Sequence, residues 1–137
     1  MKMNIHTNKP AYLVSLAIVF CLLWIPAYAE RKLNVFDVNA LFSGKTIHSY
    51  HEQKKFDIIL YFAPKGTFRG IRNGKKSSGK WWVNDKGEIC VKRVAISRCR
   101  VVIEHNGTYK KYKLKNEKDL ILMETLTAIE DGNPKKF

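Results

Sequence analysis

The chain has 137 residues and carries 25 lysines and arginines against 12 aspartates and glutamates, a formal net charge of +13 at pH 7. This length excludes a chain of several domains, and the sequence contains no repeat, long linker or low-complexity tract. A basic excess of this size attracts nucleic acid, lipid headgroups or acidic glycans, although lysines also keep a small β-protein soluble.

The N-terminus has the three parts of a secretory signal peptide. Two lysines precede an apolar run over residues 13–25, and "PAYA" follows with the small residues that a signal peptidase recognises. The alternative is an uncleaved membrane anchor, for which the run is short. We therefore expect residues 1–29 to be removed, leaving a single domain over residues 30–137 with no transmembrane span.

The mature chain is accordingly expected in the periplasm or outside the cell. It keeps 23 basic residues against 12 acidic ones, a net charge of +11. In that compartment a lipid headgroup or glycan of the envelope, or a small ligand, is a better partner than nucleic acid. We expect no specific nucleic acid partner and a monomeric protein.

Short elements follow one another along the mature chain. The stretch "FDVNALFSG" has the pattern of one short helix, with Asp37 as its cap and Gly44 at its end. After it the hydrophobic period changes to two, which indicates strands. We expect strands near residues 46–50, 56–63, 67–72, 80–84, 88–93, 98–104, 108–114 and 120–129, with a loop over residues 73–79.

These strands predict the fold. Regular short strands separated by turns indicate an antiparallel sandwich or barrel, and a sequential meander favours the up-and-down barrel. Eight strands enclose either packed side chains or one small ligand. Because several inward positions are aromatic, we expect a filled interior or a shallow cavity at one mouth. The predicted fold is all-β, a small eight-stranded antiparallel meander barrel, lipocalin-like, preceded by one short helix.

Cys90 and Cys99 are the only cysteines of residues 30–137. They flank a turn, so their strands run antiparallel side by side, and facing cysteines in such a ladder come within bridging distance. Outside the cytoplasm a disulfide persists. We expect a structural disulfide; the alternative is a reactive pair, which more often uses closer spacing such as C-x-x-C.

That disulfide leaves a question about Arg100. If both cysteines lie on one face of their hairpin, Arg100 shares the other face with apolar residues that require the core. Either a bulge or a position at the end of the barrel accommodates Arg100, or Arg100 enters the barrel, where it needs a carboxylate, an aromatic ring or an anionic ligand. In the second case it stacks on Trp81 or Trp82 or binds an anion. These three are the candidate ligand-binding residues.

Basic residues also gather on strand 108–114 and in the loop before Trp81. In "YKKYKLK" lysines alternate with Tyr112 and Leu114, so we expect them on one outer face with Tyr109 in line. Such a face suits phosphate or glycan binding, while the alternative is an ordinary solvated surface. The predicted anion-binding surface consists of Lys75, Lys76, Lys111, Lys113 and Lys115.

Catalytic and metal-binding patterns are weak. His48 and His51 fall on opposite faces of a strand, and no strong ligand spacing occurs elsewhere. No serine has an evident base partner, and the carboxylates are scattered. We therefore expect no enzymatic activity, no catalytic residue, no metal and no cofactor.

Part of the chain resembles a known group. "YFAPKGTFRG", "SSGKWWVNDKGEICV" and "RCRVV" are similar to segments of small secreted bacterial proteins of unknown function, which share a proline–glycine turn, a G-x-W strand and a two-cysteine hairpin. These elements fall on Phe62, Pro64, Gly66, Gly70, Gly79, Trp81, Cys90 and Cys99. The resemblance covers roughly residues 40–133. It implies a lipocalin-like or avidin-like barrel and no particular activity.

The sequence therefore favours a non-enzymatic β-barrel that binds a small or anionic ligand. The alternative is an accessory or inhibitor protein that docks on a protein partner at the envelope. An exposed apolar patch would favour this alternative, whereas a polar cavity at a barrel mouth would favour the first.

Overall fold

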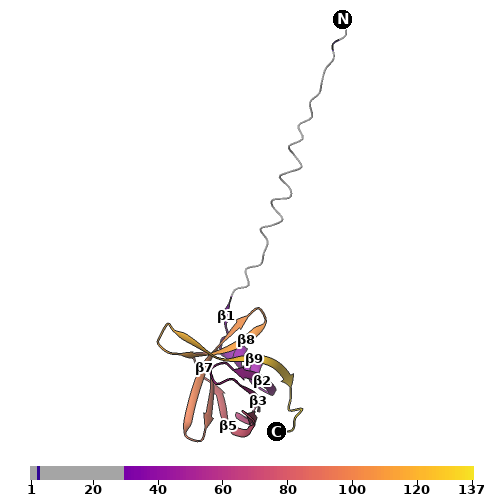
Figure 1. Cartoon of the computed structure of the whole chain (residues 1–137), viewed down its shortest axis with the longest axis vertical. Helices are drawn as coiled ribbons and strands as arrows, with labels where there is room; N and C mark the ends of the chain where they lie inside the picture. Colours follow the sequence, from indigo (N-terminus) through magenta and orange to yellow (C-terminus); the bar gives the residue numbers. More distant parts are fainter. Residues whose placement is uncertain (1–2, 4–29) are drawn as a thin grey trace.

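The computed structural model describes residue 3 and residues 30–137 of the chain (Figure 1). The rest of the predicted signal peptide lies outside the described residues. Within them, no helix is long and apolar enough to cross a bilayer. The elements are β1 (Arg31–Lys32), α2 (Val35–Phe42), β2 (Lys45–His51), β3 (Phe56–Phe62), β4 (Thr67–Arg72), β5 (Lys75–Val83), β6 (Ile89–Arg93), β7 (Ile96–His105), β8 (Thr108–Leu114) and β9 (Leu120–Asp131).

Strands β2 to β9 form a closed barrel. Each pairs antiparallel with the next along the chain, and β9 pairs back with β2, so every connection is a hairpin between neighbours. Closure gives backbone hydrogen-bonding groups partners on both sides of each strand. The predicted eight-stranded antiparallel barrel with one preceding helix is confirmed. The short β1, which the sequence did not reveal, pairs with β7 at residues 103–104.

The two ends of the barrel differ. Because strand direction alternates, the turns after β2, β4, β6 and β8 all lie at one end, which we call the mouth. At the opposite end α2 places Val38 and Phe42 in the core. The helix cap is Asn34, whose side chain accepts a hydrogen bond from the Asp37 backbone N–H at 2.8 Å. The predicted cap at Asp37 is therefore wrong, because the helix begins at Val35, two residues earlier.

Aromatic rings fill the closed half of the barrel. Phe62 meets Phe42 and Trp81 edge-on, with ring centroids 5.1 Å and 5.7 Å apart. The indole nitrogen of Trp81 donates to the Ala63 carbonyl at 2.8 Å, so its polar atom is satisfied inside the core. These rings therefore occupy the part of the barrel interior that lies next to α2.

The segment 73–79, predicted to be a loop, is mostly strand. Only Asn73 and Gly74 turn, with φ angles of 49° and 71°, and β5 begins directly after them. Positive φ at both positions is the pattern of a type I′ turn, which Asn-Gly favours and which fixes the register of a hairpin. At Gly79, an added Cβ would lie 2.1 Å from the Lys92 carbonyl oxygen, so glycine permits the close approach of β6.

The cysteine pair links the next hairpin. Cys90 on β6 and Cys99 on β7 are direct partners in the ladder, with Cα atoms 4.0 Å apart, and form a disulfide. The expected bridge is confirmed. The ladder continues on both sides of it without a shift of register, from residues 89 and 100 to residues 93 and 96.

Candidate functional site

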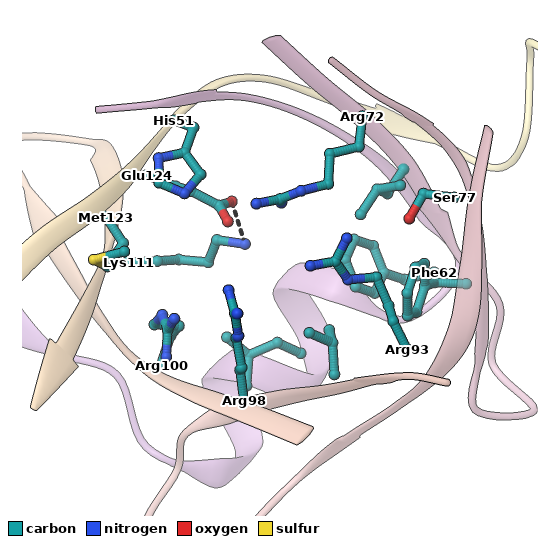
Figure 2. A pocket seen from close by; sticks show the side chains of 14 residues that line it. His51, Phe62, Arg72, Ser77, Arg93, Arg98, Arg100, Lys111, Met123 and Glu124 are labelled. Carbon is teal, nitrogen blue, oxygen red and sulfur yellow. Dashed lines mark ion pairs between the residues drawn. The ribbon is translucent and has the colours of Figure 1, made fainter. Parts of the chain in front are cut away.

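A cavity of about 50 Å³ lies at the mouth of the barrel (Figure 2). Its apolar lining comes from core residues such as Leu60, Phe62 and Ile89, and the rest of its lining is strongly polar. The polar lining residues are His51, Arg72, Ser77, Arg93, Arg98, Arg100, Lys111 and Glu124. The interior is thus filled at one end and holds a shallow cavity at the other.

The disulfide register directs two arginines into this cavity. Arg100 is the ladder partner of Ile89, and Arg98 is the partner of Val91. All four line the cavity, because side chains two residues apart share a face. The alternative of a bulge before Arg100 is wrong, since the β6–β7 ladder is regular. One guanidinium nitrogen of Arg100 donates to the Cys99 carbonyl at 2.9 Å.

Two further arginines reach the same space from the mouth ends of their strands. Arg72 is the last residue of β4 and shares the inner face with Phe68, and Arg93 is the last residue of β6. Figure 2 shows Arg72, Arg93 and Arg98 directed towards a common centre. The Arg72 guanidinium also lies 4.9 Å from the ring centroid of Phe56, a cation–π contact that helps to hold it.

The opposite wall carries a buried ion pair. Lys111 on β8 and Glu124 on β9 are ladder partners, and the ammonium contacts the carboxylate. Their side chains are only 9% and 12% exposed. The hydroxyl of Ser49 donates to the same carboxylate at 3.0 Å. Both contacts are made by the same carboxylate oxygen, Oε2.

Lys111 therefore does not belong to an outer surface, and its predicted position is wrong. The prediction placed Tyr112 and Leu114 inside because they are apolar, but Tyr109 is the β8 residue that packs against the core. Alternation then puts Lys111 on the inner face. The buried carboxylate of Glu124 supplies the counter-charge that an inward lysine requires.

The cavity has a strong positive bias. Five cationic side chains and one carboxylate line it, a formal charge of +4 with His51 neutral. Within residues 30–137, none of the four lining arginines takes part in an ion pair. Burial lowers the pKa of Arg72, as does the charge of Arg93, and burial likewise lowers the pKa of Arg100. The free energy of keeping these groups charged would fall if an anion bound among them.

Both His51 and Glu124 have lost their titratable proton at neutral pH, so the imidazole is neutral and the carboxylate is charged. Burial lowers the pKa of His51, and the positive charge of Arg72 lowers it further. Its ring nitrogen Nδ1 accepts the backbone N–H of Lys54 at 3.3 Å, which a neutral ring permits. Burial alone would raise the pKa of Glu124, but the charge and hydrogen bond of Lys111 and the hydroxyl of Ser49 bring it below its ordinary value.

Of the three predicted ligand-binding residues, Arg100 is the one that lines the cavity. Trp81 is 5% exposed within the core, and Trp82 points to the other face of β5, where it is 40% exposed. Strand alternation requires this split, although the sequence did not decide which ring faces inward. The exposed lysines Lys75, Lys76, Lys113 and Lys115 lie near the turns after β4 and β8, so they flank the mouth.

The sequence prediction did not place Arg72, Arg93 or Glu124 in a cavity, and it considered His51 only as a weak candidate for a metal ligand. Strand alternation offered a signal for Arg98, because Arg98 lies two residues before Arg100 and so shares its face. The residues described contain no group of three His, Cys, Asp or Glu side chains able to hold a metal ion. Comparisons with protein families, with curated proteins and with solved structures found no match for this chain.

Proposed function

We propose that this protein is a non-enzymatic binding protein of the periplasm or the cell exterior, and that it holds a small anion in the mouth of its barrel. One observation carries the proposal. Four arginines that have no ion-pair partner within residues 30–137 converge on a cavity whose single carboxylate is already paired. Three of these arginines, Arg72, Arg93 and Arg100, are half-buried, whereas Arg98 is exposed. Half-buried guanidinium groups need a counter-charge, and their planar fork matches carboxylate and phosphate oxygens.

The size of the cavity limits the ligand. A volume of about 50 Å³ is several times the roughly 10–15 Å³ that one water molecule needs. This is room for a phosphate, sulfate or carboxylate group and too little for an acyl chain or a sugar ring. The ligand is therefore a small oxyanion, or the anionic end of a larger molecule that extends out of the mouth.

The chemistry of the site suits holding an anion rather than transforming one. Glu124 is occupied by Lys111 and Ser49, and Nδ1 of His51 is occupied by a backbone N–H. These contacts hold both side chains in place, and the four arginines, which stay charged at neutral pH, are suited to binding an anion and not to transferring a proton. Export is supported by the predicted signal peptide and by the Cys90–Cys99 disulfide, which persists in an oxidising compartment.

Titration calorimetry of the purified protein with inorganic phosphate and with acetate tests the proposal. We expect saturable binding that Arg98→Gln with Arg100→Gln weakens about tenfold to a hundredfold, because charge-assisted hydrogen bonds are lost. The matched control is Arg69→Gln, an exposed arginine on the outer face of β4. Absence of binding, or an equal loss in the control, would refute the cavity as the site and favour docking on a protein partner.

A further inference from the structure

The turn between β6 and β7 differs from the other tight hairpin turns of residues 30–137. Asn73-Gly74 and Asn106-Gly107 both have positive φ at each position, as type I′ turns require. The β6–β7 turn instead consists of Val94 and Ala95, and Val94 has a φ of 53°. A β-branched residue in this region is strained, whereas glycine or asparagine would adopt it readily.

The packing of the barrel does not explain why a valine occupies this turn position. Its side chain is 98% exposed, so it contributes no packing that would offset the strain of the turn. Ala95 is also exposed, and Ile96 beside it is 60% exposed. Three consecutive apolar residues thus project from the tip of one hairpin at the mouth. Contact with an apolar surface outside the molecule would bury these three side chains.

Cations flank this apolar tip. Arg93 and Arg98 stand on either side of it and line the cavity, and Lys92 lies on the outer face of the same hairpin. The other turns of the mouth add further exposed lysines, including Lys54, Lys75 and Lys115. Apolar side chains surrounded by cations fit the boundary between headgroups and acyl chains of an anionic bilayer.

We propose that the β6–β7 hairpin inserts Val94 and Ile96 into the surface of an anionic phospholipid membrane and brings a headgroup phosphate to the arginine cavity. The inference rests on the proposed function for what the arginines bind, and it adds the source of the anion. The broad cationic rim favours a lipid surface over an apolar groove of a protein, because lipid charge is spread across the whole face that the mouth would meet.

Sedimentation with phosphatidylcholine vesicles, with and without phosphatidylglycerol, tests this inference. The variant combines Val94→Asn with Ala95→Gly, the turn sequence that the chain already uses at residues 73–74 and 106–107. We expect it to unfold at a temperature equal to or above that of the wild type, to bind inorganic phosphate as before, and to bind anionic vesicles at least about tenfold more weakly.

The matched control is Phe36→Ser. Phe36 is 80% exposed on α2 at the closed end of the barrel, so its removal should leave vesicle binding unchanged. Unchanged vesicle binding by the hairpin variant would overturn the inference, as would wild-type binding that does not depend on phosphatidylglycerol. If the wild type binds vesicles through the tip but does not bind inorganic phosphate, insertion stands and the cavity proposal fails.

Discussion

Lys111 and Glu124 face each other across β8 and β9 inside the barrel, and each is the ion-pair partner of the other. The pair separates two unlike regions. On one side the Lys111 ammonium lies 5.9 Å from the ring centroid of Phe42 in the core. On the other side lie the four arginines of the cavity. Glu124 is therefore the carboxylate of the cavity lining that offsets part of the positive charge of five cationic side chains.

Removal of that carboxylate should destabilise the barrel. For Glu124→Gln we expect the free energy of unfolding to fall by about 3–5 kcal/mol, because a buried ammonium loses its partner. Urea denaturation measures the change. Glu117→Gln, in the exposed turn after β8, is the control and should change the value by no more than about 0.5 kcal/mol. A loss below about 1 kcal/mol for Glu124→Gln would show that the arginines or solvent compensate.

Acid should destabilise the protein in two steps. The folded state holds the pKa of His51 below its ordinary value of 6.5, so below pH 6.5 the unfolded chain binds the proton first and stability falls until the folded pKa is passed. The pKa of Glu124 is also lowered, so its contribution is present above about pH 4.5 and is lost as pH falls through the folded pKa.

Urea denaturation at a series of pH values separates these two steps. His51→Asn should remove the loss of stability that begins below about pH 6.5 and leave the loss at lower pH in place. If the variant and the wild type lose stability in parallel over the upper range, the pKa of His51 does not differ between the folded and unfolded states.

The Cys90–Cys99 bridge should show itself by mass and by stability. The oxidised protein should weigh about 2 Da less than the reduced protein, since one disulfide removes two hydrogens. Replacement of both cysteines by alanine should lower the free energy of unfolding by about 2–4 kcal/mol. The same denaturation curve after reduction of the wild type should match that of the double variant. Two free thiols in the purified protein would contradict the bridge.

The exposed lysines of the mouth should govern retention by an acidic polysaccharide. Changing Lys75, Lys113 and Lys115 to glutamine should make the protein elute from heparin at lower salt, since these charges flank one opening. The matched control changes Lys32, Lys65 and Lys86, which are exposed near the closed end. Equal shifts for the two triple variants would indicate a response to net charge alone.

The sequence predicted the strands well wherever one face is apolar. Ile58, Leu60 and Phe62 alternate along β3 and are buried as expected. The first half of β5 was missed because its inward residue near the mouth, Ser77, lines the polar cavity and not the core. A pattern based on apolar periodicity has no signal where the inner face of a strand is polar.

The same reason explains the errors at the site. Interior positions were assigned to apolar residues, so Lys111 was placed outside and Arg100 was given a bulge as one alternative. Both enter the barrel because other strands supply what they need, a carboxylate on β9 and an open cavity beside β7. Such partners are far apart in the sequence, and only the closed barrel brings them together. Local rules fail here at the positions that carry the chemistry.

Helix α2 closes one end of the barrel and so limits access to its interior. Because Val38 and Phe42 of α2 fill that end, the cavity opens at the mouth and the barrel does not form a pore. Under the proposed function, an anion would arrive and depart by the same route, past the hairpin that carries Val94. A membrane or protein that covered the mouth would then slow the entry and the release of the proposed anion alike. Its residence time, and not only its affinity, would depend on what covers the mouth.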